Sequence, residues 1–134
     1  MTDHKHQAYA LLRIALGVNF LAHGLVRLPK LAGFANGIAE SFADTILPQP
    51  AVLAFGYVIP IAETVLGLLL VIGLLSRYTL IASFLLMIAL IFGSCLLENW
   101  ETVGLQVVYT VVLFLLLFYQ EYNGYALDSR NHGL

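Results

Sequence analysis

The sequence predicts an all-α integral membrane protein, a four-helix bundle with a short amphipathic surface helix between the first and second spans. The 134 residues are 60% hydrophobic and only 10% charged, which is far from the mixture of a soluble domain. Four apolar stretches are each long enough to cross about 30 Å of hydrocarbon as a helix. They show no alternation of polar and apolar residues, so a strand barrel is not expected. The predicted spans cover residues 8–28, 53–76, 78–97 and 102–120 of a single domain.

The first predicted span, residues 8–28, has one polar and closely packing face. At roughly 100° per residue, this face collects two arginines, a phenylalanine and two flanking glycines, with an asparagine and a histidine on its edge. In the same order these are Arg13, Arg27, Phe20, Gly17, Gly24, Asn19 and His23. The opposite face is lined by leucine, isoleucine and valine. The segment is too long for a cleaved signal peptide and runs into further spans, so we expect it to remain in the protein.

The segment after Pro29 predicts a short amphipathic helix at the membrane surface. Its apolar residues recur at spacings of three or four, which suits a helix with one buried face. They are Leu31, Phe34, Ile38, Phe42 and Ile46. Pro48 and Pro50 end the pattern. Such a helix either covers a site as a lid or simply covers the bundle, and the sequence leaves both interpretations open.

The second span, residues 53–76, carries a proline and an acid within an otherwise apolar run. Hydrocarbon cannot solvate a charge, so Glu63 must find a partner or stay neutral. Pro60 cannot donate to the carbonyl of Gly56, which predicts a kink. Gly56, Glu63 and Gly67 share one helical stripe, and small residues on that stripe allow a neighbouring helix to approach closely. We therefore expect the stripe to face inward.

The third and fourth spans, residues 78–97 and 102–120, complete the bundle. Residues 76–78 leave room only for a tight turn, so the second and third spans form a helical hairpin. Gln106 and Tyr109 are three residues apart and lie on one side of the fourth span. An aromatic belt follows at its end, formed by Phe118, Tyr119, Tyr122 and Tyr125.

Aligning the antiparallel spans by their predicted ends places Glu63 near the midplane, level with Val18 and Asn19. Arg13 and His23 then lie on either side within reach, and both are expected partners of Glu63. In one interpretation, Glu63 pairs with Arg13 only to fix helix packing.

Nearer the outer face, polar side chains from several spans converge under the surface helix and predict a polar pocket: His23, Arg27, Gln106, Tyr109 and Cys95. A histidine beside an acid can pass protons, so His23 and Glu63 are the candidate catalytic residues. The candidate substrate-binding residues are Arg13, Arg27, Gln106 and Tyr109. In the structural alternative, Gln106 bonds to His23 and these groups serve packing alone.

Charge and cysteine content exclude several classes of function. The formal net charge is −2 with no basic run, so nucleic acid is not an expected partner. The single Cys95 excludes an internal disulfide, a CxxC pair and a cysteine-ligated cluster made by this chain alone. His23 is the one histidine within a predicted span, so two intramembrane histidine ligands for a haem are not available. No haem, metal or flavin site is visible.

Lysine and arginine are slightly more frequent on the side of the chain ends, where Lys5, Arg77 and Arg130 fall, than on the side of Arg27 and Lys30. The bias is mild. It predicts that both termini are cytoplasmic in a bacterial-type inner membrane.

Three segments, in order, resemble the DoxX/DoxD-like membrane proteins. They are RIALGVNFLAHGLVRL in the first span, VIPIAETVLGLLLVIGLLSRYTLIAS across the second and third, and NGYALD near the end. The most specific parts are IP-x-AE-x-x-x-G and GY-x-LD. The resemblance covers nearly the whole chain. Through it, the residues that match family positions are Arg13, His23, Gly24, Glu63, Arg77 and, in the tail, Asp128.

The resemblance implies a four-helix membrane protein. The best-understood branch is a subunit of thiosulfate:quinone oxidoreductase, which passes electrons from thiosulfate into the quinone pool. The first hypothesis is therefore a quinone-interacting membrane subunit of a redox complex, with quinone as substrate or acceptor, a small anionic donor, and other subunits and lipid as partners. The second is a non-catalytic membrane anchor or assembly subunit. A weaker third is a small proton-linked permease, although no broken helix pair supports it. The sequence leaves open whether the chain is itself an enzyme.

Overall fold

The computed structural model describes residues 3–128, and that part of the chain contains helices and turns but no strand. The elements in order are α1 (Asp3–Arg27), the 3₁₀ turn η1 (Leu28–Lys30), α2 (Leu31–Ser41), α3 (Gln49–Ile72), α4 (Ser76–Leu96), α5 (Trp100–Phe118) and the 3₁₀ turn η2 (Gln120–Tyr122). Four stretches are long and apolar enough to cross a membrane, namely His4–Ser41, Gln49–Ile72, Ser76–Leu96 and Trp100–Phe118. The predicted all-α, multi-pass membrane fold is confirmed.

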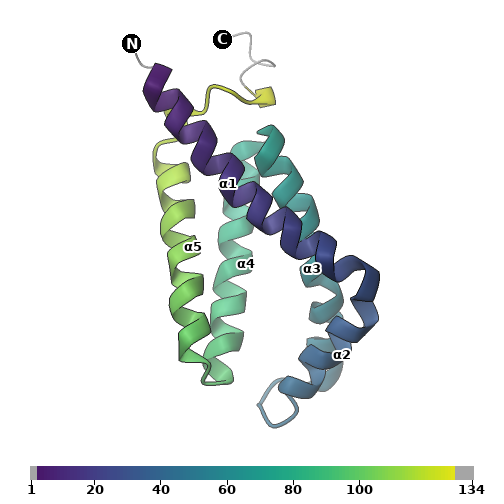
Figure 1. The fold of residues 1–134 in the computed structure, drawn as a ribbon. Coiled ribbons are helices and arrows are strands. Elements are labelled where there is room, and N and C mark those ends of the chain that lie inside the picture. Colours follow the sequence, from purple (N-terminus) through teal and green to yellow (C-terminus); the bar gives the residue numbers. More distant parts are fainter. Residues whose placement is uncertain (1–2, 129–134) are drawn as a thin grey trace.

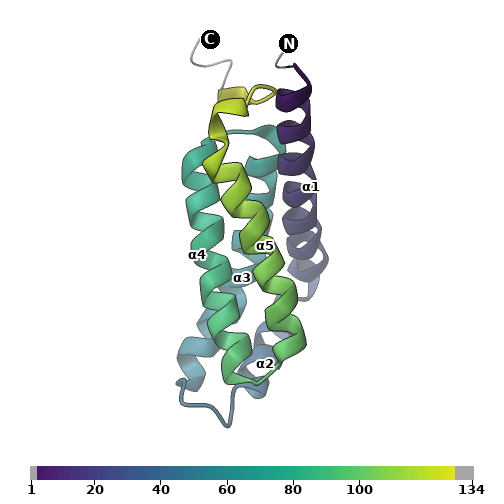
Figure 2. The same cartoon turned by 90° about the vertical axis from the view of Figure 1, so that its left-hand side faces the viewer.

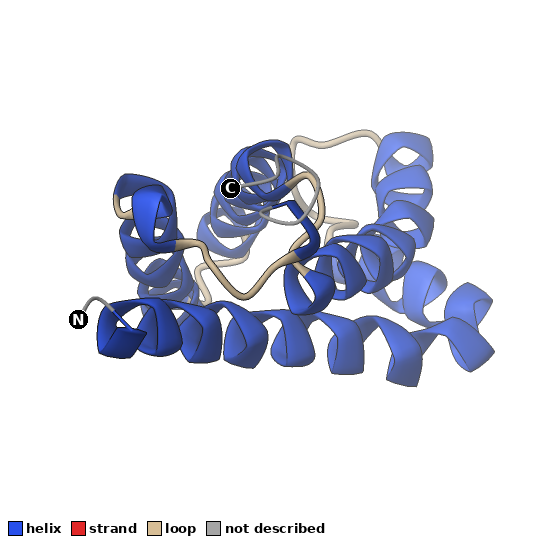
Figure 3. Cartoon of the chain, turned by 90° about the horizontal axis from the view of Figure 1, so that it is seen from above, coloured by secondary structure: helices blue, strands red, loops and turns tan. Residues whose placement is uncertain are grey.

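The helices pack as two pairs that meet at one end of the molecule. α1 lies along α3, and α4 lies beside α5, as the views in Figures 1 and 2 agree. Seen from above, α1 runs as one long rod along a side of the bundle (Figure 3). α2 folds against α3 at the end opposite to the start of α1 and to η2 (Figure 1).

The apolar core fills the half of the bundle that holds the ends of the described chain. Its buried members come from all four long helices: Tyr9, Leu16, Phe20, Leu70, Leu80, Met87, Leu113 and Leu116. Most of them lie near the start of α1 and α4 or near the end of α3 and α5, which meet at this end (Figure 1). The other half, toward α2, is left for a cavity.

The inward stripe of the second span is confirmed, and glycine sets the close approach of α1 and α3. Glu63 is buried with 7% of its surface exposed, and Gly56 and Gly67 are buried on the same helix. A Cβ atom on Gly67 would lie 2.8 Å from the Gly17 carbonyl oxygen, and one on Gly24 would lie 2.7 Å from the Pro60 carbonyl oxygen. Such distances leave no room for a side chain, so the two backbones touch.

The turn between α3 and α4 lies three residues before the predicted position. α3 ends at Ile72 because Gly73 adopts a left-handed conformation with φ of 73°, and its N–H bonds to the Leu69 carbonyl. A left-handed glycine is a common helix end. α4 then begins at Ser76, so the predicted turn at 76–78 is wrong, and residues 76–78 form the first turn of α4.

The short helix between the first two spans is present, but it ends earlier than its apolar pattern. α2 stops at Ser41, and Ile46 lies beyond it with 84% of its surface exposed. Phe42, directly after α2, is buried close to Gly93 of α4, and Ala35 of α2 packs on Gly56 of α3.

Candidate functional site

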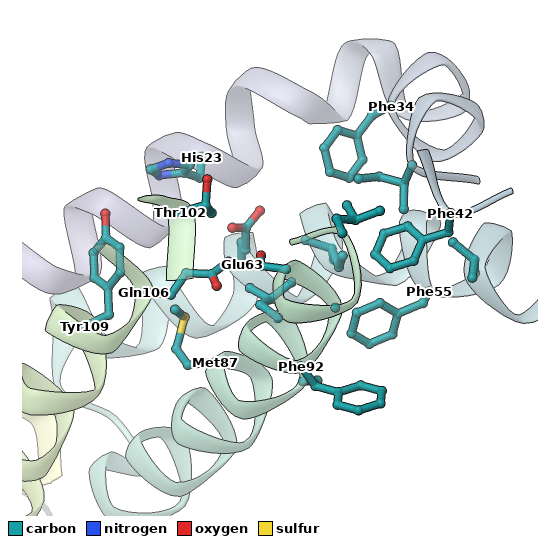
Figure 4. A pocket seen from close by; sticks show the side chains of 18 of the residues that line it. His23, Phe34, Phe42, Phe55, Glu63, Met87, Phe92, Thr102, Gln106 and Tyr109 are labelled. Carbon is teal, nitrogen blue, oxygen red and sulfur yellow. The ribbon is translucent and has the colours of Figure 1, made fainter. Parts of the chain in front are cut away.

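A cavity of about 600 Å³ lies between α2 and the diverging helix pairs. Every helix contributes to its lining, which is mostly apolar. Phe34 and Phe42 from the α2 region, Phe55 from α3 and Phe92 from α4 lie toward one end (Figure 4). This volume suits a small organic molecule.

Polar side chains gather at the other end of the cavity, next to the core. We call them the polar cluster and define it as Asn19, His23, Arg27, Glu63, Gln106 and Tyr109, all of which line the cavity. Figure 4 shows that His23 comes from α1, Glu63 from α3, and Gln106 and Tyr109 from α5. Of the five residues predicted to converge here, His23, Arg27, Gln106 and Tyr109 line the cavity, whereas the prediction for Cys95 is wrong.

Arg27 is the partner of Glu63. Its Nη1 donates a hydrogen bond of 2.9 Å to Glu63 Oε1 and forms a salt bridge, with side-chain exposures of 30% for Arg27 and 9% for Glu63. The guanidinium carbon also lies 4.5 Å from the centre of the Phe34 ring. A cation over a ring face is attracted by the ring's quadrupole, so the arginine is fixed from two sides.

Asn19 links the histidine to the tyrosine of the polar cluster. Its Nδ2 donates a hydrogen bond of 2.8 Å to the Tyr109 hydroxyl, which joins α1 to α5. Its backbone carbonyl lies 2.7 Å from His23 Nδ1. The imidazole is exposed at the edge of the cavity, and this bond orients its Nε2 away from the helix backbone.

Gln106 carries an unsatisfied acceptor. Its Oε1 is buried, and no hydrogen-bond donor among residues 3–128 reaches it. Buried polar atoms in folded proteins are nearly always paired, and an orphaned one calls for an explanation. Since Gln106 lines the cavity, a bound molecule is the natural source of a donor.

The prediction that Arg13 partners Glu63 in the cavity is wrong. Arg13 is 1% exposed and lies at the opposite end of the bundle, where Nε donates to the Leu70 carbonyl at 2.8 Å. Its Nη1 donates to Asn123 Oδ1 at 2.6 Å and its Nη2 to the Tyr125 carbonyl at 2.8 Å. Arg13 is not among the cavity-lining residues, and its contacts fix the C-terminal segment to the bundle.

Cys95 is half-buried and free, and it does not line the cavity although its neighbour Ser94 does. Between residues 3 and 128, no three side chains of His, Cys, Asp or Glu come together in a way that could hold a metal ion.

Several lining residues were not predicted as part of the site. Phe34 and Phe42 were assigned only to the apolar face of α2, and Thr102 was not singled out. The signal available for the phenylalanines was their spacing on an amphipathic helix, which does not distinguish contact with lipid from contact with a ligand.

Comparison with known proteins supports one family. Residues 8–94 match the model of the DoxX family, which covers the first three spans and includes His23, Arg27 and Glu63. Neither the curated proteins nor the solved structures include a significant match. The matched segment is more than half of the chain, and the chain therefore belongs to the DoxX family.

Proposed function

We propose that this protein is a membrane subunit of a redox complex and that it binds a quinone in the cavity. The observation that carries this proposal is the cavity itself, about 600 Å³ in volume with an aromatic, apolar end and a polar cluster at the other. A quinone also has a polar and an apolar end, because its ring oxygens form hydrogen bonds and its tail is apolar. Sites of this kind typically combine apolar walls with a few placed polar groups. The resemblance to the thiosulfate:quinone oxidoreductase subunit points the same way.

In this proposal the polar cluster holds the quinone ring. The Tyr109 hydroxyl uses a lone pair to accept from Asn19, so its own hydrogen can be donated to one ring oxygen. Reduction of a quinone to a quinol takes up two electrons and two protons. The exposed His23 imidazole takes up a proton at Nε2 from outside the cavity and donates it to one ring oxygen, and a second round of uptake and donation supplies the other ring oxygen. The Glu63 carboxyl group lines the same cavity. The electrons come from a donor held by another subunit.

Arg27 is the group proposed to attract an anionic donor such as thiosulfate. Its salt bridge with Glu63 offsets part of its charge, but 30% of its side chain is still exposed at this end of the bundle. Arg27 therefore combines two tasks in this proposal, fixing Glu63 and drawing an anion to the rim. With both termini cytoplasmic in a bacterial-type inner membrane, this rim lies in the outer half of the bilayer.

The test is to purify the protein in native nanodiscs with its partners retained and to measure decylubiquinone reduction by thiosulfate. Substitutions His23→Ala and Glu63→Gln are expected to abolish most of the turnover. The matched control is Glu40→Gln, which removes an exposed carboxylate from α2 at the same end of the molecule. Turnover that survives in both cavity variants would remove the polar cluster from the chemistry.

A second candidate is a non-catalytic anchor or assembly subunit, and the exposure of α5 favours it. Only Leu113 and Leu116 of this 19-residue helix are buried, so most of its apolar surface is left for lipid or for another subunit. In this case the isolated chain would turn over no quinone. The chain purified under mild conditions would retain a partner protein, and the Glu63→Gln variant would retain the same partner.

A further inference from the structure

The long helices meet along seams, and two of these seams are closed. α1 and α3 touch through their backbones at Gly17, Gly24 and Gly67. α4 and α5 pack side by side and are joined by the short turn at residues 97–99 (Figure 2). The helices contact each other less between α1 and α5 and between α3 and α4. On the sides of the bundle, these two seams are therefore where the cavity can reach the lipid.

The seam between α1 and α5 is polar. The Asn19 side chain bridges the two helices by donating to the Tyr109 hydroxyl at 2.8 Å, and the Phe20 ring meets the Tyr109 ring edge-on. Beyond this bridge, His23 and Gln106 line the cavity, and the imidazole is exposed. A hydrocarbon chain lying here would cover polar groups without pairing them, which is costly. This seam suits a polar ring and water.

The seam between α3 and α4 is apolar. Along it the cavity is lined by Phe55 and Ile59 of α3 and by Ala89 and Phe92 of α4. Phe55 is 36% exposed and Phe92 is 53% exposed, so the lining reaches the surface of the molecule there. Counting along the two antiparallel helices from the turn that joins them places both rings at nearly the same depth.

Both of these rings face the hydrocarbon of the bilayer. They lie within the lengths of α3 and α4 that are long and apolar enough to cross a membrane. They also lie at the aromatic end of the cavity, away from the polar cluster (Figure 4). The polar cluster and the apolar seam are thus at opposite sides of one cavity.

The size of the cavity limits how much of a membrane quinone it can enclose. A volume of about 600 Å³ takes the ring and the first part of a tail. The isoprenoid tail of a membrane quinone is much longer than this cavity. The rest of the tail must therefore pass through an opening into the lipid.

Building on the quinone binding proposed above, we infer that the ligand is a long-tailed isoprenoid quinone that enters from the bilayer between α3 and α4 and leaves its tail in that seam. The ring then reaches the polar cluster, and Phe55 and Phe92 flank the tail where it leaves the protein. Ala89 is the smallest side chain of the seam and sets its width. The seam between α1 and α5 is left to water, which brings protons to the exposed His23 imidazole.

The experiment compares two ligands of the full chain in nanodiscs by titration calorimetry, with empty nanodiscs subtracted. One is decylubiquinone, and the other is dimethoxymethylbenzoquinone, the same ring without the tail. The test variant is Ala89→Trp, which fills the seam between α3 and α4. The matched control is Leu105→Trp, which places the same side chain at the seam between α1 and α5, where Leu105 lines the cavity and is 62% exposed.

The quantity to compare is the ratio of the two affinities, because it isolates the contribution of the tail. In Ala89→Trp the preference for decylubiquinone should fall about tenfold, since a bulky side chain in an occupied seam is overpacked. In Leu105→Trp the preference should be kept. An unchanged ratio in Ala89→Trp, or a fall in Leu105→Trp, would overturn the proposed route and leave quinone binding standing. Binding of neither ligand to the unchanged protein would overturn both.

A second measurement needs no substitution and covers the case in which Ala89→Trp does not fold. Decylubiquinone with a diazirine at the end of its tail is bound to the unchanged protein and activated by light. The expected cross-links lie within residues 55–59 and 89–92. Cross-links within residues 19–23 or 102–106 instead would show that the tail leaves between α1 and α5, and would overturn the inference.

Discussion

Arg27 at the end of α1 and Glu63 in the middle of α3 form a salt bridge of 2.9 Å at the junction of the cavity and the helix interface. α1 and α3 are therefore aligned so that Glu63 lies level with His23 and Gly24, and not with Val18 and Asn19 as predicted. The same alignment places Gly24 on Pro60 and Gly17 on Gly67. An arginine that also contacts Phe34 connects the acid of α3 to the start of α2.

Removing either charge of this pair should destabilise the protein more than removing both. Glu63→Met leaves Arg27 without its carboxylate, and Arg27→Met leaves a buried carboxylate unpaired. Each single change should cost about 3 kcal/mol, at the lower end of the range for breaking a buried pair because Arg27 is 30% exposed. The double variant should cost less than either single variant, because it leaves no unpaired charge. Unfolding in detergent micelles by added sodium dodecyl sulfate measures all three, and additive costs would show that the two charges act independently.

Arg13 should prove to be a structural residue that leaves ligand binding untouched. Arg13→Lys keeps the charge but cannot make three divergent hydrogen bonds to Leu70, Asn123 and Tyr125. We expect a loss of about 1.5–3 kcal/mol in the free energy of unfolding, the range for hydrogen bonds made by a charged group. We also expect faster proteolysis within residues 119–128, with decylubiquinone affinity unchanged.

The control for Arg13 is Arg77→Lys, an exposed arginine at the same end of the molecule, which should alter none of these measurements. A fall in quinone affinity with no change in proteolysis would instead return Arg13 to the ligand site.

The sequence was sufficient for the spans and for the inward face of α3, because both depend on helical periodicity and on the cost of exposing a carboxyl group to lipid. It was not sufficient for the partner of Glu63. The estimate of depth set the end of the first span, near residue 28, level with the start of the second span. In the structure the first part of α3 packs on α2, through Gly56 and Ala35, so α1 meets α3 farther along that helix. The resulting offset of about five residues corresponds to about 7 Å of helix, enough to exchange one arginine for the other. The predicted bounds of the second span, 53–76, were also about four residues too late, since α3 runs from Gln49 to Ile72.

The cavity was predicted only in part for a different reason. The polar residues His23, Gln106 and Tyr109 could be placed at similar depths by counting along helices. The apolar end could not, since Phe34 and Phe42 have the same spacing whether α2 lies on lipid or closes a cavity. Only the packing of α2 on α3, through Ala35 and Gly56, decides between these arrangements.

Alanine at Gly67 should be far more harmful than alanine at Gly104. A Cβ atom on Gly67 would lie 2.7 Å from the Leu21 Cα and 2.8 Å from the Gly17 carbonyl oxygen, so α1 and α3 would have to separate. We expect a loss of about 1–3 kcal/mol from this overpacking. Gly104 in α5 has nothing within 4 Å of such an atom, so Gly104→Ala should gain about 0.5–1 kcal/mol from helix propensity. Thermal unfolding followed by circular dichroism separates the two, and equal effects would contradict the close contact of α1 and α3.

Asp128 should stabilise the start of α4 from the far end of the sequence. Its two carboxylate oxygens accept hydrogen bonds of 2.7 Å from the backbone N–H groups of Leu75 and Ser76, and its own N–H donates to the Gly73 carbonyl at 3.1 Å. Leu75 has a positive φ of 52°, a strained conformation for a leucine, and these bonds help to hold it. The carboxylate thus does for α4 what an N-cap residue normally does from within the helix.

Asp128→Ala should therefore lower the free energy of unfolding by about 1–2 kcal/mol, the cost of a lost helix cap. Asp128→Asn should lose less, because the amide keeps one acceptor but gives up the charge that favours the positive end of the helix dipole. Asp44→Ala, which removes an exposed acid from the loop before α3, is the control and should have little effect. Hydrogen exchange of the Leu75 and Ser76 amides gives the local readout. If these amides exchange at the same rate in Asp128→Ala as in the unchanged protein, the Asp128 carboxylate does not cap α4.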